Sequence, residues 1–199
     1  MKHKNIFVAC DTSNLSEIKK IIKQTQSNKL KIDPKFGLQF FYSKNGRKFL
    51  ENFNKDFWLD LKINDIPQTA LSALDSLKDL KKCKYITVHA NGGLEMLRVI
   101  KKKAKSINKD LKVLGVTILT SLNNKSLEEI GHTKSVEQLV LKQAGLIKKS
   151  GCDGIVCSAQ EAKMVRKKFK NLFIITPGIR LPGDSANDQS RIMTPNDAF

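Results

Sequence analysis

The chain has 199 residues and a formal net charge of +17, and hydrophobic residues make up 40% of it. This length and composition fit one well-cored domain, residues 1–199, and they exclude a disordered chain and a membrane-spanning helix, since no apolar run approaches roughly 20 residues. The excess charge is carried mainly by lysines scattered on polar helix faces, whereas a nucleic-acid surface would cluster arginine and aromatic residues, so we expect no nucleic-acid partner.

In chain order, apolar runs rich in β-forming residues alternate with amphipathic helical patterns. The first run follows basic residues but is cut by Asp11, too early for the core of a signal peptide, and we therefore expect a cytoplasmic protein. Strands are expected at residues 5–11, 31–37, 57–62, 85–90, 112–120, 154–158 and 173–178, and helices at 14–26, 94–107, 135–149 and 159–169. This alternation predicts parallel strands with helical crossovers, in a closed barrel or in a doubly wound sheet.

Polar residues at the carboxyl ends of the strands favour the barrel. In a (β/α)8 barrel these ends converge on one rim, where barrel enzymes place their active sites. An open sheet would gather only those beside its switch point and would usually begin with a glycine-rich turn, which this sequence lacks. We expect His89, at one of these ends, to be a hydrogen-bonded structural residue and not a base. The polar residues at the carboxyl ends of the strands are Asp11, Asp60 with Lys62, His89, Thr120, Ser158 and Thr176.

The end of the sequence leaves the expected barrel one βα unit short. Thr194 as N-cap, Pro195 at the first helical position and Asp197 predict the opening turn of a seventh helix. No eighth strand follows, so a unit of very roughly 30 residues is missing. Two explanations stay open: a fragment or early-stopped reading frame, and a shortened protein that closes in another way. We favour the first and expect such a chain to be less stable than a closed barrel.

The cysteines and histidines do not form a metal-binding pattern. None of the cysteines is paired in a C-x-x-C motif, and the three histidines are far apart in the sequence. Because zinc needs about four convergent ligands, we expect no metal site and mostly buried, reduced thiols. The cysteines are Cys10, Cys83, Cys152 and Cys157.

The stretch FWLDLKINDIPQTA, residues 57–70, carries charges where a buried strand is expected. Because side chains alternate along a strand, Asp60 and Lys62 share one face and point into the barrel mouth, while Asp65 follows in the loop. A buried ion pair of purely structural role would account for Asp60 and Lys62. The further carboxylate, at the rim where barrel enzymes work, favours a catalytic site.

Within this stretch, LDLKINDIPQT resembles the DxKxxDIPxT signature of the orotidine 5′-phosphate decarboxylase family. The resemblance continues in order along nearly the whole chain and is closest to the bacterial, single-function form. It implies a TIM barrel that decarboxylates orotidine monophosphate to uridine monophosphate and CO2 in pyrimidine biosynthesis, without a metal or a cofactor. The further motifs are VACD (8–11), KFGLQFF (35–41), VHANGG (88–93), VTILTS (116–121), DGIVCSAQE (153–161), TPGIR (176–180) and GDSANDQSRIMTP (183–195).

The resemblance assigns the chemistry to an array of Lys35, Asp60, Lys62 and Asp65. Lys62 would donate the proton to C6 of the pyrimidine and stabilise the developing carbanion, and Asp60 would lie against the substrate carboxylate. Asp65, together with Thr69, would be supplied by the partner subunit of a homodimer.

The resemblance also assigns the residues that bind the rest of the nucleotide. Asp11 and Lys35 would hold the ribose hydroxyls, and Thr120 would hold the edge of the pyrimidine. Arg180 and Gln189 would bind the phosphate, far from the reacting carbon, where binding energy could help to close loops.

The sequence departs from the family pattern at several places. The Gly-Arg pair of an eighth strand, which completes the phosphate site in the family, does not occur after Phe199, so we expect weak phosphate binding. Asn64 stands where the family often has His, and Gln39 where Glu is common. Two alternatives remain: a related magnesium-dependent sugar-phosphate decarboxylase or aldolase, and an inactive barrel that binds nucleotides or RNA.

Overall fold

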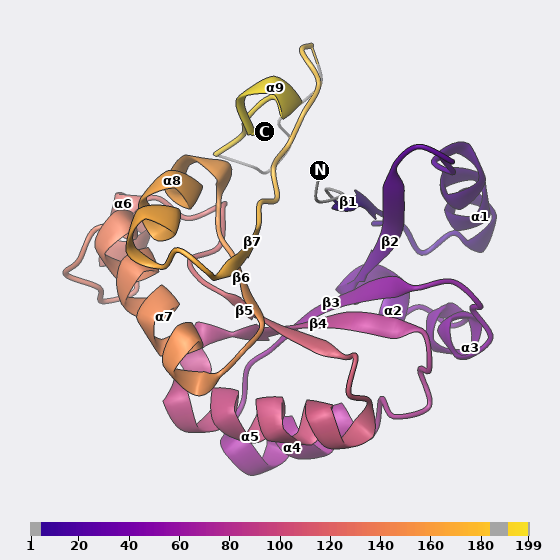
Figure 1. Ribbon diagram of the computed structural model, residues 1–199, viewed down its shortest axis with the longest axis horizontal. Coiled ribbons are helices and arrows are strands. Elements are labelled where there is room, and N and C mark those ends of the chain that lie inside the picture. The colour runs from indigo at the N-terminus through magenta and orange to yellow at the C-terminus, as the bar shows by residue number, and fades with distance from the viewer. Residues whose placement is uncertain (1–4, 184–190, 199) are drawn as a thin grey trace.

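The computed structural model describes residues 5–183 and 191–198 (Figure 1). Within them, parallel strands form one sheet in the order β1-β2-β3-β4-β5-β6-β7, so every strand pairs with its neighbour in sequence. Figure 1 shows the sheet curled, with the long helices on its outer side and with β1 and β7 at its two edges. The strands are β1 (Asn5–Ala9), β2 (Lys31–Gly37), β3 (Phe57–Ile63), β4 (Cys83–His89), β5 (Lys112–Val116), β6 (Gly154–Val156) and β7 (Phe173–Ile175).

Helices follow the strands and cover the outer face of the sheet. The four helices expected from periodicity are present with ends shifted by at most two residues, and a further helix begins at Pro67. The helices are α1 (Leu15–Gln24), α2 (Leu38–Phe41), α3 (Gly46–Glu51), α4 (Pro67–Asp75), η1 (Ala90–Gly92), α5 (Gly93–Ile107), α6 (Asn124–Glu129), α7 (Val136–Ser150), α8 (Ala159–Lys168) and α9 (Pro195–Ala198).

The sheet buries apolar side chains on both faces, as parallel sheets do. The outer layer packs helix residues such as Ile18, Leu97 and Val165, each fully buried, against the outward side chains of the strands. A smaller inner cluster fills the barrel and includes Trp58 and Tyr85, both in edge-to-face contact with Phe7. Trp58 is therefore a filler of the barrel interior.

The strand expected at residues 112–120 is shorter than predicted. β5 ends at Val116, although the next residues remain buried. The Thr117 hydroxyl donates to the Val156 carbonyl at 3.0 Å, in addition to the bond from its backbone N–H at 3.1 Å. The apolar and β-branched residues that follow Val116 therefore belong to the buried start of the loop after β5, and the strand itself does not extend through them.

The short helices α2 and α3 pack around a cluster of aromatic side chains. Phe36, fully buried on β2, contacts the rings of Phe40, Phe49 and Phe53 with centroid separations between 5.2 and 6.2 Å. Helices of this length are unstable alone, so we attribute their formation to this packing.

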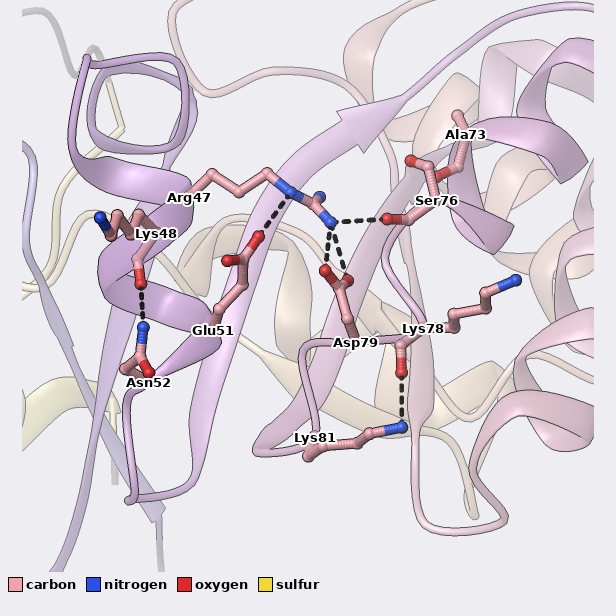
Figure 2. Close-up of polar contacts among 9 residues, drawn as sticks. All are labelled: Arg47, Lys48, Glu51, Asn52, Ala73, Ser76, Lys78, Asp79 and Lys81. Atoms are coloured by element: carbon pink, nitrogen blue, oxygen red, sulfur yellow. Dashed lines mark hydrogen bonds and ion pairs between the residues drawn. The ribbon is translucent and has the colours of Figure 1, made fainter.

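Arg47 fixes α3 to the turn that follows α4. Its guanidinium reaches Glu51 at 3.1 Å, both carboxylate oxygens of Asp79 at 2.7 Å and the Ser76 carbonyl at 2.8 Å, as Figure 2 shows. This connection joins the aromatic cluster to the helix that begins beside the candidate site.

The expected helical turn at the end of the sequence is confirmed as α9. The Thr194 hydroxyl donates to the Asp197 carboxylate at 2.6 Å and accepts from the Asp197 backbone N–H at 3.4 Å. Before α9, Ile179 and Met193 form a parallel bridge that returns the chain alongside the end of the β7 segment. Among the helices of the described residues, none is both long enough and apolar enough to cross a membrane.

Candidate functional site

Four charged side chains form one chain of ion pairs at the carboxyl ends of the first three strands. Lys62 Nζ lies 3.0 Å from Asp60 Oδ2, and Lys35 Nζ lies 3.5 Å from the same oxygen. Lys35 Nζ also lies 3.3 Å from Asp11 Oδ1, directly after β1. The structure thus brings Asp11, Lys35, Asp60 and Lys62 together in alternating charge. The strand-end pattern predicted the convergence of Asp11, Asp60 and Lys62, whereas Lys35 was expected from the family resemblance.

Asp60 is the buried centre of this cluster. The residue is only 7% exposed, and its Oδ1 accepts a hydrogen bond from the Thr87 hydroxyl on β4 at 2.7 Å. Burial acts to raise the pKa of Asp60, but the charges of Lys62 and Lys35 and the hydrogen bonds from Thr87 and Lys62 outweigh it and hold the pKa below its usual value. Asp60 is therefore a carboxylate at neutral pH, with both of its oxygens already engaged.

The Lys62 side chain lies on the same side of β3 as Asp60, but the backbone between them is not that of a regular strand. Its backbone has φ of +49°, a left-handed conformation that costs a side-chain-bearing residue about 1 kcal/mol or more. The pairing of β3 with β4 is irregular here, since Leu59 to Ile63 on β3 faces only Ile86 to Val88 on β4. The predicted orientation holds, but a bulge produces it.

Thr87 holds this bulge in place. Its hydroxyl oxygen accepts the Lys62 backbone N–H at 2.9 Å while the same hydroxyl donates to Asp60. Thr87 is fully buried and connects the backbone of Lys62 with the carboxylate that pairs with the Lys62 ammonium. No sequence signal marks Thr87 as part of the site, because a threonine inside an apolar strand fits ordinary β propensity.

His89 is hydrogen-bonded, as expected. Its Nδ1 accepts the Asn91 backbone N–H at 3.3 Å and begins the short helix η1. Burial, and secondarily the charge of Lys62, lower the pKa of His89. Gly93, which follows η1 with φ of +81°, supplies the backbone conformation that begins α5.

Asp65 and Thr69 lie outside the cluster, on the exposed surface between β3 and α4. The Asp65 carboxylate accepts the Ile66 backbone N–H at 2.7 Å, and Thr69 stands exposed in the first turn of α4. Between them, Ile66 is 68% exposed. Both polar residues are therefore open to solvent, and the ion pairs of the cluster do not include them.

Thr120 and Arg180, expected to bind the base and the phosphate, come after later strands of the same sheet. Thr120 is half-buried after β5, and Arg180 is half-buried after β7. The Arg180 guanidinium donates to the Ile179 carbonyl at 3.0 Å, and its backbone N–H donates to the Met193 carbonyl at 3.0 Å. Gln189 lies outside the described residues.

Comparison with known proteins points to one family. The family model described as "Orotidine 5'-phosphate decarboxylase / HUMPS family" matches residues 4–199. The chain is 42% identical over 169 residues to an orotidine 5′-phosphate decarboxylase of Staphylococcus epidermidis, covering 82% of this chain and 73% of that protein. It is 36% identical over 195 residues to the enzyme of that name from Erythrobacter litoralis, covering 97% of this chain and 84% of that protein.

A solved structure agrees with these sequence matches. The crystal structure of an orotidine 5′-phosphate decarboxylase from Lactobacillus acidophilus superposes with a TM-score of 0.80 at 29% identity, covering 89% of this chain and 82% of that one. This similarity, together with the curled parallel sheet, confirms the predicted barrel class and excludes the doubly wound alternative.

Proposed function

The chain belongs to the orotidine 5′-phosphate decarboxylase / HUMPS family, and on that basis we propose that it converts orotidine 5′-phosphate to uridine 5′-phosphate and CO2. It is an enzyme of the carboxy-lyase class and a component of pyrimidine biosynthesis. The observation that supports this most directly is the Lys62 ammonium, held 3.0 Å from the buried Asp60 carboxylate at a strand end of the barrel.

This geometry suits the removal of a carboxylate that leaves charge on carbon. When the bond between C6 and the carboxylate breaks, CO2 departs and the electron pair stays on C6. An ammonium fixed beside C6 stabilises that charge and then gives its proton to the carbon, which yields the product. Because Asp60 and Thr87 fix Lys62 before substrate arrives, little reorganisation is needed during the reaction.

Asp60 has a second role in the proposal. A carboxylate that is almost fully buried and remains ionised would stand close to the carboxylate of the substrate, and their repulsion is relieved as CO2 leaves. Lys35, shared between Asp60 and Asp11, would hold the ribose hydroxyls together with Asp11.

We propose that the active site is completed by a second copy of the chain. The exposure of Asp65, Ile66 and Thr69 fits a surface that meets a partner. Mixing inactive Lys62→Ala with inactive Asp65→Ala protein should then restore activity, because each mixed dimer contains one intact site. Mixed dimers without activity would refute the sharing of residues.

The phosphate group is assigned to Arg180 and Gln189 by the family resemblance. Arg180 stands on the same rim as the ion-pair cluster but after β7, far along the sheet from Lys62. Binding at this distance would supply energy that is used at the reacting carbon. We also propose that the protein acts in the cytoplasm.

The test of the proposed function is product formation by the purified chain. Incubation with orotidine 5′-phosphate, followed by chromatography, should yield uridine 5′-phosphate at a rate that EDTA does not change. A chain that is inactive on this substrate but cleaves or decarboxylates a sugar phosphate only with magnesium would contradict the proposal and support the related enzyme class.

A further inference from the structure

A second buried ion pair lies on the same rim, away from the charged cluster. Arg191, which precedes α9, pairs through Nη1 with Glu161 Oε1 in the first turn of α8. The side chains of Arg191 and Glu161 are only 11% and 4% exposed. The other carboxylate oxygen of Glu161 accepts the Ser158 backbone N–H at 2.9 Å, so Glu161 is fixed to the end of the β6 segment.

The same guanidinium also holds the loop after β5. Arg191 Nη2 donates to the Leu119 carbonyl at 2.8 Å and approaches the Ile118 carbonyl at 3.4 Å. One side chain therefore connects the segment between β7 and α9, the start of α8 and the loop after β5. The residue directly after Leu119 is Thr120, the expected contact for the pyrimidine edge.

We propose that Arg191 is a positioning residue that fixes the loop after β5, so that Thr120 stands where it meets the base of the substrate. The role of Thr120 rests on the proposed function, whereas the fixing of the loop rests on the contacts of Arg191 alone. A guanidinium is suited to this task, because its planar fork can engage a carboxylate and two carbonyl groups in one fixed geometry.

A gain in folding stability does not by itself explain why Arg191 and Glu161 form a buried ion pair. Replacing a buried pair by uncharged residues of similar size is often neutral, because the two charges lose much hydration energy when they are buried. The contacts with Leu119 and Ile118 are different, since they select one arrangement of a loop. Positional errors of about 1 Å in a binding group can cost a large factor in rate.

The experiment compares a double variant with a matched single one. Glu161→Gln keeps the side-chain length and an oxygen that can accept the Ser158 N–H, but its amide group then faces the Arg191 guanidinium and leaves that charge buried without a carboxylate, so the single variant should melt at a lower temperature than the double variant. The double variant Glu161→Gln with Arg191→Met removes the contacts of Arg191 with the loop without leaving an unpaired buried charge. We expect the double variant to melt within about 5 °C of the unchanged protein, because neither charge is left buried alone.

Two measurements then test the role of Arg191. Hydrogen exchange of the backbone amides of residues 119–122 should be about tenfold faster in the double variant, as expected for the loss of a charge-assisted hydrogen bond. KM for orotidine 5′-phosphate should rise by about tenfold with kcat changed much less, because Thr120 contributes binding common to substrate and transition state. Thr120→Val should reproduce the rise in KM while leaving exchange in residues 121–122 unchanged.

The possible outcomes separate this inference from the proposed function. Unchanged exchange in the double variant would overturn the inference, whatever the activity. Faster exchange with an unchanged KM would also overturn it, because the loop would then not position a substrate contact. If the unchanged chain does not act on orotidine 5′-phosphate, the proposed function fails, and the exchange measurement alone decides whether Arg191 fixes the loop.

Discussion

Replacing Lys62 by alanine should remove turnover while leaving the fold in place. The variant loses both the proton donor, worth about 10² to 10⁴ in rate, and a fixed charge beside the reacting carbon, worth about 10² to 10³. Because one group supplies both effects, they do not simply multiply, and we expect kcat/KM to fall by at least about 10⁴. Lys35, 3.5 Å from Asp60 and shared with Asp11, is held too firmly to replace it.

The structural cost of this substitution should be small. The Lys62 side chain is about one-third exposed (34%), so its pair with Asp60 is partly screened and contributes less than about 1 kcal/mol of stability. Asp60 keeps its contacts with Lys35 and the Thr87 hydroxyl. Uridine 5′-phosphate should therefore still bind.

The assay is the loss of the orotate ultraviolet absorbance, with binding of uridine 5′-phosphate measured by calorimetry on the same samples. Lys62→Arg is the matched control, because it keeps a positive charge near Asp60 but holds its protons too tightly to donate one. Both variants should be inactive yet able to bind the product. Activity of Lys62→Ala within tenfold of the unchanged chain would refute the role assigned to Lys62.

Three further predictions concern the supports of the site and the rest of the fold. Thr87→Val should lower kcat/KM by about 10- to 100-fold, because it frees the Lys62 backbone and raises the pKa of Asp60. Thr87→Ser keeps the hydroxyl and should have kcat/KM near that of the unchanged chain. Equal kcat/KM values for the two variants would contradict the role of the Thr87 hydroxyl. Because folding lowers the pKa of Asp60, its contribution to stability should be complete above about pH 5 and lost as the pH falls below about 4. The unfolding free energies of Asp60→Asn and the unchanged chain should therefore approach each other as the pH falls below about 4. A difference between these two free energies that does not change with pH would count against the lowered pKa. A double-mutant cycle of Arg47→Met and Asp79→Ala should give a coupling of about 0.5 to 1 kcal/mol without changing KM, and a coupling of zero would show that the exposed contacts do not join α3 to α4.

The alternation of strands and helices could be predicted from the sequence because both follow from local apolar periodicity. Even β2, with a proline and three charged residues among its seven, has the predicted bounds, because it pairs with β1 on one side and β3 on the other. The helices α2 and α3 were not predicted, because the rings around Phe36 stabilise them through contacts distant in sequence.

The meeting of Asp11, Asp60 and Lys62 could be predicted in outline, because strand ends converge in a parallel barrel, whereas Lys35 was assigned by the family resemblance. Its detailed support could not be predicted. The left-handed backbone of Lys62 depends on the pairing of β3 with β4, and no residue type in the motif indicates it. The partner of that bulge, Thr87, lies 25 residues away.

The most direct test of the account is whether product formation depends on the Lys62 ammonium in a chain that still binds nucleotide. The unchanged chain should convert orotidine 5′-phosphate to uridine 5′-phosphate, whereas folded Lys62→Ala should bind uridine 5′-phosphate and form no product. The account would be contradicted by product formation in Lys62→Ala at a rate close to that of the unchanged chain, or by the absence of product from the unchanged, folded chain.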